Sequence, residues 1–286
     1  MPPKRGEPPE PLPGIVDSHA HTSWSREFDD DRAAVLDRAW AAGLTRIVEV
    51  GVSLRTTLAC KAMAEADSRF IAVGGIHPHE ANQLTRDGAA FRAAIEAGGY
   101  AAIGEIGLDF FHKHSTPEEQ YEALAWQLDL ALDVKLPVMI HAREADEECF
   151  AILAGWAERA GSVLESGRPV GMMHCFSGDL ELAQRYIDIG FVISVPGTVT
   201  FKGNERGQAV ASDIPLTSML VETDCPYLTP APHRGLRNEP AYVVETARFV
   251  AALRGISPEE VARTTSMNAA RFFGFEAAFE AVAGTA

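Results

Sequence analysis

Short apolar runs alternate with longer amphipathic segments along nearly the whole chain. Eight of the apolar runs have the length and the β-branched content of buried strands. They cover Ile15–Asp17, Arg46–Val50, Phe70–Gly74, Ala101–Gly104, Pro137–Ile140, Val170–Met173, Phe191–Ser194 and Met219–Val221. The alternation predicts strands that are each followed by a helix, which is the pattern of βαβ units.

The amphipathic segments between these runs carry the start signals of helices. Residues 29–43 begin with three aspartates, and the helix dipole favours acidic side chains in a first turn. Thr116 is followed three residues later by Glu119, which is the pattern of a capping box. The same pattern recurs with Ser257 and Glu260. We therefore expect helices to begin after Thr116 and after Ser257.

Eight βα units without a change of composition predict an α/β fold with one parallel sheet. Eight strands are the number that closes a (β/α)8 TIM barrel, and the 286 residues are close to the roughly 250 typical of that fold. A doubly wound open sheet is the alternative, but no GxGxxG motif follows the first run. We expect a single domain over residues 14–274, a disordered tail over residues 1–13 and a C-terminal tail over residues 275–286.

Composition narrows the cellular setting and the class of partner. The formal net charge of −15 disfavours a broad basic surface that would bind nucleic acid along its length. The four cysteines are scattered without a CxxC pair, which favours a reducing, cytoplasmic location. The chain begins without the apolar core of a signal peptide, and no apolar run is long enough to span a membrane.

All nine histidines end or follow predicted strands, and none falls in a predicted helix. His19 and His21 lie two positions apart, so both side chains point to the same face of a strand. The others are His77, His79, His112, His114, His141, His174 and His233. In a TIM barrel these positions share the C-terminal face, where active sites lie. Solvated histidines would also be found on outer helices, so the pattern favours a metal centre.

Carboxylates occupy the same kind of position. Glu105 ends the fourth run, and Glu222 and Asp224 end the eighth. A carboxylate directly after a buried run is costly unless it is paired, hydrogen-bonded or bound to metal. The alternative is that these groups cap the following helices or pair with arginines such as Arg143.

Six groups at the strand ends are expected to face inward, which is more than the three or four protein ligands that one cation needs. They are His19, His21, Glu105, His141, His174 and Asp224. We therefore predict two divalent cations, Zn²⁺, Mn²⁺ or Mg²⁺, with Glu105 as a bridging carboxylate. Asp224 is expected to bind one cation and to accept a proton from the attacking water. This chemistry is metal-assisted hydrolysis.

The motifs resemble, in order and spacing, those of the TatD family of metal-dependent deoxyribonucleases. They are DSHAH, GIHPH, AIGEIGLDFF, PVMIHAREA, MMHCFSG, TFKG and LVETDCPYLTPAPHRGLRNEP. The resemblance implies a TIM barrel that binds divalent metal and cleaves DNA, in this family often as a 3′-to-5′ exonuclease. It places metal ligands on the same six residues. It also implies active-site roles for His77, in phosphate contact, and for Glu222, in support of the ligands.

An acidic DNase is expected to act on single strands or 3′ ends, because a strand end needs few phosphate contacts. Candidate substrate-binding residues in the loops are Lys113, Arg143, Lys202, His233, Arg234 and Arg237. Phe110, Phe111 and Tyr227 are candidates to stack on bases. The alternative for each basic residue is a pair with a nearby acid. Roles in DNA repair and in degradation of released DNA are both compatible with such an enzyme.

Two other functions remain as alternatives. One is a hydrolase of amide or ester bonds from the same superfamily, including aminoacyl ester bonds on tRNA. Its amide-cleaving relatives commonly carry a carboxylated lysine as the bridge, and Glu105 at this strand end disfavours that version. The other is a noncatalytic metal-binding protein, which a full ligand set with a candidate base disfavours.

Overall fold

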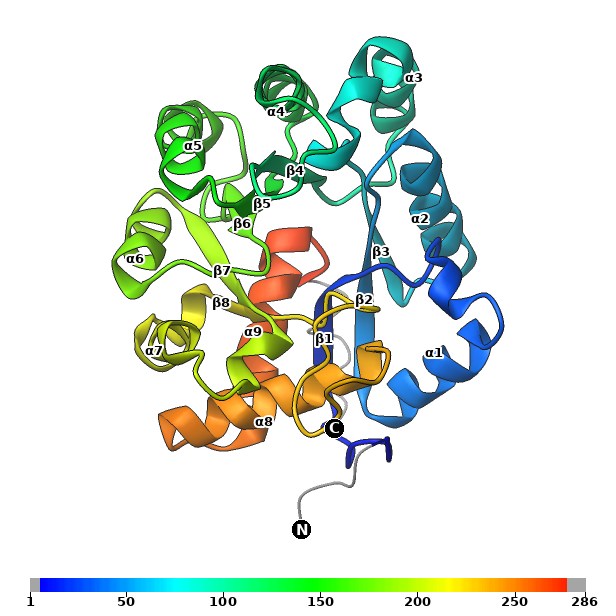
Figure 1. Cartoon of the computed structure of the whole chain (residues 1–286), viewed down its shortest axis with the longest axis vertical. Coiled ribbons are helices and arrows are strands. Elements are labelled where there is room, and N and C mark those ends of the chain that lie inside the picture. Colours follow the sequence, from blue (N-terminus) through cyan, green and yellow to red (C-terminus); the bar gives the residue numbers. More distant parts are fainter. Residues whose placement is uncertain (1–5, 277–286) are drawn as a thin grey trace. The chain divides into compact units, whose positions relative to one another are not determined.

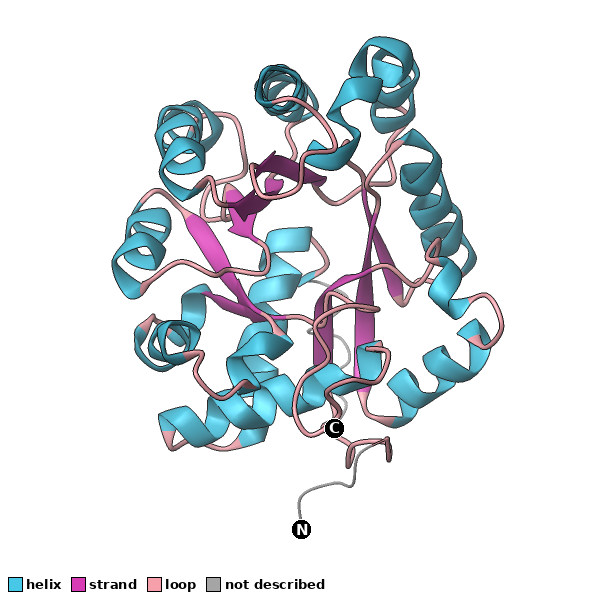
Figure 2. Cartoon of the chain, in the orientation of Figure 1, coloured by secondary structure: helices cyan, strands magenta, loops and turns pink. Residues whose placement is uncertain are grey.

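The computed structural model describes residues 6–276, and within them each of the eight strands is followed by a helix (Figure 2). The strands are β1 (Ile15–Ala20), β2 (Leu44–Val50), β3 (Phe70–Val73), β4 (Ile103–Asp109), β5 (Val138–Arg143), β6 (Gly171–Met173), β7 (Phe191–Val195) and β8 (Met219–Val221). All eight predicted runs contain a strand, which confirms the predicted alternation.

The helices lie between and after these strands. They are α1 (Arg32–Ala41), α2 (Leu54–Ala66), α3 (Leu84–Glu96), α4 (Pro117–Val134), α5 (Asp146–Gly161), α6 (Leu180–Asp188), α7 (Glu205–Asp213), α8 (Val243–Arg254) and α9 (Pro258–Phe273), with short 3-10 turns in several loops. Within the described residues, no helix combines the length and apolar character needed to cross a bilayer.

The strands form two sheets, with the orders β1-β2-β3 and β4-β5-β6-β7-β8. The pairs β4–β5, β5–β6 and β7–β8 are parallel. Every residue of β1 and of β4 is buried. Burial on both faces is typical of parallel strands and explains why they appear in the sequence as continuous apolar runs.

The described chain forms two compact units. Unit 1 contains residues 6–48, 175–184 and 193–276, and unit 2 contains residues 49–174 and 185–192. The chain passes between the units within β2, after β6, within α6 and within β7. In unit 1, α9 packs against β1, β8 and α8. In unit 2, α4 packs on β4 and α5 packs on β5 (Figure 1).

The first segment of the described chain is packed, in contrast to the expected disordered tail over residues 1–13. Leu12 is buried, and its backbone N–H donates to the Ala42 carbonyl at 2.8 Å. The Gly6 N–H donates to Nδ1 of His233 at 3.1 Å. Buried Leu12 supplies the apolar contact that holds residues 6–13 on unit 1. Residues 1–5 and 277–286 of the predicted tails lie outside the described residues.

The helix-start signals are confirmed at two of the three positions. Thr116 and Glu119 form a reciprocal capping box at the start of α4, and Ser257 accepts the Glu260 N–H at the start of α9. In contrast, α1 begins at Arg32, three residues later than the aspartates suggest. Two of these aspartates form ion pairs instead, Asp29 with Arg32 at 2.8 Å and Asp31 with Arg237 at 2.7 Å.

Three strands continue past the polar residues that were expected to end them. β1 runs to Ala20, β4 to Asp109 and β5 to Arg143. Polar groups in and beside these extensions are hydrogen-bonded, as Glu105 and Asp109 are to His141. A buried carboxylate with partners does not interrupt a strand, so polarity alone misplaces these ends.

Candidate metal-binding clusters

His19, His21 and Asp224 form a cluster in unit 1, here called the His19 cluster. The Nε2 atoms of the two imidazoles are 3.2 Å apart. Oδ1 of Asp224 lies 3.8 Å from Nε2 of His19 and 3.4 Å from Nε2 of His21. Both rings are buried. Two imidazole nitrogens and a carboxylate oxygen that face one point are a donor set that fits a divalent cation.

The backbone around Asp224 explains how a residue beyond β8 reaches β1. The Asp224 N–H donates to the His19 carbonyl at 3.0 Å, and the His21 N–H donates to the Cys225 carbonyl at 3.1 Å. Asp224 has a φ of +55°, a left-handed conformation that costs a non-glycine residue about 1–2 kcal/mol. The hydrogen bonds on either side hold this conformation and keep the Asp224 carboxylate beside the two histidines.

Asp17 supports this arrangement and was missed by the sequence reasoning. Its carboxylate accepts the Thr223 N–H at 2.9 Å and the Thr223 hydroxyl at 2.6 Å. Burial raises the pKa of Asp17 well above its usual value, although the hydrogen bonds from Thr223 oppose the rise. The available signal was an acidic residue inside an apolar run, which requires a buried partner.

Glu222, the other carboxylate after β8, is fully buried. It accepts the Cys175 N–H at 2.8 Å and the Ser194 hydroxyl at 2.5 Å, one on each oxygen. These bonds tie together three segments of unit 1 that are distant in sequence. Such contacts suit the supporting role predicted for Glu222.

Glu105 lies at the centre of a second cluster, in unit 2, here called the Glu105 cluster. Its Oε1 atom lies 2.8 Å from Nδ1 of His141, 3.4 Å from Nε2 of His77 and 3.5 Å from Nε2 of His174. The structure thus brings together three of the predicted ligands, Glu105, His141 and His174. Imidazole nitrogens around one carboxylate oxygen again fit a divalent cation.

Two glycines allow this close approach. Gly107 is paired with His141 in the β4–β5 register, and a Cβ on Gly107 would lie 1.9 Å from the His141 carbonyl oxygen. A Cβ on Gly75 would lie 2.4 Å from the Gly104 carbonyl carbon. Without a side chain at either position, the segments that carry Glu105, His77 and His141 can lie side by side.

The hydrogen bonds of His77 define its protonation state. Nδ1 of His77 accepts the His79 N–H at 3.1 Å, so a neutral ring carries its proton on Nε2, the atom that faces Glu105. Burial lowers the pKa of His77 to about 4. His77 is therefore a neutral N–H donor in this arrangement, which suits the phosphate contact predicted for it better than metal ligation.

The pKa of His141 shifts in the opposite direction to that of His77. Burial alone would lower its pKa, but hydrogen bonds to Asp109 and Glu105 raise the pKa of His141 to about 9. Nε2 of His141 lies 3.2 Å from Oδ2 of Asp109. Asp109 was missed by the sequence reasoning. A carboxylate on the far nitrogen of a ligating histidine is the usual way in which such a ring is oriented.

Side-chain amides on α4 hold the backbone of unit 2 near these groups. Gln120 accepts the Asp109 N–H at 2.8 Å and donates to the Asp109 carbonyl at 2.9 Å. Gln127 accepts the Ile76 N–H at 2.7 Å and donates to the Ile76 carbonyl at 2.9 Å. The two glutamines are seven residues apart and so lie on one face of the helix. The sequence reasoning missed both.

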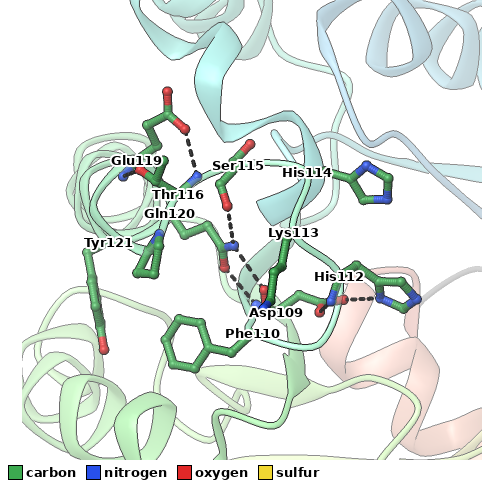
Figure 3. Close-up of a pocket in the computed structure, with 11 residues that line it drawn as sticks. Asp109, Phe110, His112, Lys113, His114, Ser115, Thr116, Glu119, Gln120 and Tyr121 are labelled. Atoms are coloured by element: carbon green, nitrogen blue, oxygen red, sulfur yellow. Dashed lines mark hydrogen bonds and ion pairs between the residues drawn. The ribbon is translucent and has the colours of Figure 1, made fainter.

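The predicted substrate-binding residues of unit 2 lie on its surface. Lys113 lines a pocket of about 590 Å³ together with residues between Asp109 and Tyr121 (Figure 3). The Arg143 guanidinium lies 5.1 Å from the centroid of the Phe111 ring, and Phe111 is about half exposed. The basic side chains of Lys113 and Arg143 are both accessible to an anion from solvent.

The predicted substrate-binding residues of unit 1 have different surroundings. Lys202 is exposed, and the Arg234 guanidinium lies 3.9 Å from the centroid of the Phe201 ring. Arg237 is paired with Asp31 at 2.7 Å, which is the alternative considered for lone basic residues. Lys202 and Arg234 are therefore the basic residues of unit 1 that stay candidates for binding substrate.

His233 does not lie on the surface as a substrate contact would require. It is fully buried, its ring stacks on Tyr242 with centroids 4.1 Å apart, and its Nδ1 accepts the Gly6 N–H. The ring thus packs inside unit 1. This corrects the expectation of a direct substrate contact, because the loop that carries His233 folds inward over Tyr242.

The sequence matches known proteins over most of its length. The family model described as "TatD related DNase" matches residues 16–274. The metal-dependent hydrolase YabD of Bacillus subtilis is 38% identical over 262 residues, which cover 91% of this chain and 98% of the relative. A protein of Enterobacter lignolyticus named 3′-5′ ssDNA/RNA exonuclease TatD is 34% identical over 258 residues, which cover 87% and 95%.

The structure matches solved structures equally broadly. The crystal structure of YjjV, a TatD homologue from Escherichia coli, superposes with a TM-score of 0.80 at 28% identity, over 92% of this chain and 99% of that chain. A TatD family hydrolase from Entamoeba histolytica gives a TM-score of 0.79 at 20% identity, over 93% and 100%, which supports the fold alone. These matches confirm the predicted α/β fold class of the TIM-barrel type.

Proposed function

Because the chain belongs to the TatD-related DNase family and is a metal-dependent hydrolase, we propose that it hydrolyses phosphodiester bonds in DNA. In this proposal it removes nucleotides from the 3′ ends of single strands, with two divalent cations held by the residues of the two clusters. The observation that carries the proposal is the presence of two groups of imidazole nitrogens around a carboxylate oxygen, the His19 cluster and the Glu105 cluster.

Divalent cations bound at these clusters would polarise phosphoryl oxygens and lower the pKa of bound water. The protein supplies the remaining groups. The Asp224 carboxylate stands beside His19 and His21, where it can accept the proton of the attacking water. Glu105 stays the predicted shared carboxylate between the cations.

Neutral His77 contributes a hydrogen bond to the substrate in this proposal. Its Nε2–H group faces the Glu105 carboxylate, and burial keeps the ring uncharged at neutral pH. It donates to a phosphate oxygen once a substrate is bound. Glu222 acts as a positioning residue through its bonds to Cys175 and Ser194, because both of its oxygens accept hydrogen bonds from the protein.

The distribution of charge supports a strand end as the substrate. The chain has a net charge of −15, so in this proposal a few exposed basic side chains make the contact to phosphate. Lys113, Arg143, Lys202 and Arg234 are the proposed contacts. A relative with 34% identity bears the name of a 3′-5′ exonuclease for single-stranded DNA and RNA, which supports the same polarity and strand preference here.

The test uses metal-stripped protein and a single-stranded DNA labelled at its 5′ end, with Mg²⁺, Mn²⁺ or Zn²⁺ added in turn. We expect a ladder that shortens by single nucleotides from the 3′ end. Glu105→Gln and Asp224→Asn are expected to slow it by about 100-fold or more, since each removes a charged group from a cluster. Glu118→Gln, which changes an exposed glutamate in the first turn of α4, is the matched control and should cleave normally.

Other outcomes assign a different function. Hydrolysis of p-nitrophenyl carboxylic esters without cleavage of DNA would favour the amide or ester hydrolase, and aminoacyl-tRNA would then be the next substrate. Bound cations without any hydrolysis would favour a noncatalytic metal-binding protein. Internal cuts with no terminal ladder would overturn the exonuclease assignment and leave a DNA endonuclease. A cytoplasmic location and a role in DNA repair stay predictions.

A further inference from the structure

A third cluster of metal-ligating side chains lies in unit 2 and shares no residue with the His19 cluster or the Glu105 cluster. It consists of Asp109, His79 and His112 and is here called the Asp109 cluster. Oδ2 of Asp109 lies 2.8 Å from Nε2 of His79 and 2.9 Å from Nδ1 of His112. The carboxylate is buried, whereas the His79 side chain is 28% exposed and that of His112 is 46% exposed. Solvent ions can therefore reach the histidines.

The nitrogen atoms around Asp109 outnumber the hydrogen bonds that one of its carboxylate oxygens can accept. Oδ1 already accepts two backbone N–H groups, from Phe111 at 3.0 Å and from His112 at 2.8 Å. Oδ2 faces three imidazole nitrogens, because Nε2 of His141 lies 3.2 Å away as well. A carboxylate oxygen offers about two lone-pair positions, so three separate N–H donors exceed its capacity.

A cation resolves this excess. The His141 N–H can occupy one lone pair of Oδ2, in the orienting role described above. The remaining lone pair, together with unprotonated nitrogens of His79 and His112, forms a set of one oxygen and two nitrogen ligands. The contacts of Oδ2 of Asp109 with His79, His112 and His141 are then all favourable at the same time.

We propose that Asp109, His79 and His112 bind a third divalent cation of the transition-metal class, such as Zn²⁺ or Ni²⁺. Two imidazoles and one carboxylate favour these ions over Mg²⁺, which prefers oxygen ligands alone. Three protein ligands leave coordination positions open to solvent or to an anion. Asp109 and His112 also line the pocket of about 590 Å³, and His112 projects from the side opposite Glu119 and Tyr121 (Figure 3).

His114 provides the matched control. Its ring centroid lies 4.7 Å from that of His79 and 6.1 Å from that of His112, so it is part of the same histidine-rich surface. It is not among the three groups whose ligand atoms converge at Asp109. Any histidine-rich surface can bind zinc weakly, so His114→Asn separates nonspecific binding from the proposed site.

The experiment is equilibrium dialysis of the metal-stripped full-length protein against micromolar Zn²⁺ with excess Mg²⁺, followed by elemental analysis. Wild type and His114→Asn should bind one more Zn²⁺ per chain than His112→Asn and His79→Asn. Circular dichroism and the thermal midpoint of each metal-free variant establish that it is folded. The proposal is overturned if His112→Asn and His79→Asn, both folded, bind as much Zn²⁺ as wild type.

This inference does not depend on the proposed DNase activity. Zinc stoichiometry of the His112 and His79 variants tests the third site, whereas cleavage of DNA by the wild type tests the function. A wild type that binds the additional Zn²⁺ but cleaves no DNA keeps the site and rejects the activity. If the wild type cleaves DNA while it and the His79, His112 and His114 variants all bind equal Zn²⁺, the activity is kept and the third site is rejected.

Discussion

Asp17 accepts hydrogen bonds from both the backbone N–H and the hydroxyl of Thr223, at 2.9 and 2.6 Å, across a separation of 206 residues in sequence. Thr223 stands between Glu222 and Asp224, so this pair ties both carboxylates to β1. The Thr223 hydroxyl also accepts the Cys225 N–H at 3.2 Å. One threonine thus sets the position of the segment that carries the proposed base.

Thr223→Val should therefore impair the His19 cluster while it keeps the shape of the side chain. The substitution leaves a buried Asp17 oxygen without its hydroxyl donor, which costs about 1–3 kcal/mol of stability. We expect cation affinity to fall about tenfold, as for other residues that orient a metal ligand. Calorimetric titration with Mn²⁺ measures it. Thr217→Val, at an exposed threonine of unit 1, is the control. Unchanged affinity in both variants would contradict this role for Asp17.

Cation binding to the Glu105 cluster should release a proton. In the metal-free protein, hydrogen bonds to Asp109 and Glu105 raise the pKa of His141 from 6.5 to about 9 despite its burial, so the ring is protonated at pH 7. A cation must displace this proton to bind the ring. Apparent affinity is expected to rise about tenfold per pH unit up to pH 9 and to level off above it.

Competition with a chromophoric chelator between pH 7 and 10 measures how this cation affinity depends on pH.

The raised pKa of His141 also predicts how the stability of the metal-free protein depends on pH, and here the stability falls as the pH rises. The folded state binds the His141 proton more tightly than the unfolded state, so this contribution is present below pH 6.5 and is lost as the pH rises to about 9. His141→Asn should flatten both curves. Affinity that is independent of pH in the wild type would refute the assignment.

Gln120→Leu should destabilise unit 2 although it replaces a buried polar group by an apolar one. The amide serves both the N–H and the carbonyl of Asp109, and the substitution leaves these buried backbone groups without partners. We expect a loss of about 2–3 kcal/mol. For a chain of this size the thermal midpoint should fall by about 4–12 °C.

Glu122→Gln, at an exposed position on the same helix, should leave the midpoint unchanged. Differential scanning calorimetry of the metal-free proteins makes the comparison. If Gln120→Leu unfolds at the wild-type temperature, the glutamine is not required to hold the end of β4.

Lys113→Ala and Arg143→Ala should weaken substrate binding rather than the chemical step. Lys113 lines the pocket of unit 2, and the exposed Arg143 side chain lies over the Phe111 ring. Each variant should raise KM for single-stranded DNA with kcat retained. Each lost phosphate contact should also reduce the slope of log KM against log salt by about 0.7. Arg55→Ala, at an exposed arginine of α2, should change neither quantity. A loss confined to kcat would exclude the proposed phosphate contacts.

Much of the fold was predictable because its signals are local. Parallel strands that are buried on both faces appear as short apolar runs, and all eight were located. The Thr116–Glu119 box marked the start of α4 because a capping box spans only four residues. The histidines were found for a related reason. In βα units the strand ends lie on one face, so sequence position alone groups them.

The exact strand ends and the supporting carboxylates were not predictable in this way. Polarity at Glu105 and Asp109 suggested that β4 had ended, yet both side chains have partners that keep them within a buried strand. His233 is an example of a residue whose burial was not predicted. Its loop position suggested exposure, but Tyr242 and the backbone of Gly6 enclose its ring.

The sequence by itself therefore determined the order of elements, the family, and the residue types available at the strand ends. Tertiary structure alone decided which of those groups face one another. Asp17 faces Thr223, and Asp109 faces His79 and His112. The physical reason is that a buried polar group is stable only with a partner, and the chain supplies that partner from any distance along its length. Hydrophobic periodicity records burial, but it carries no information about which distant donor satisfies which acceptor.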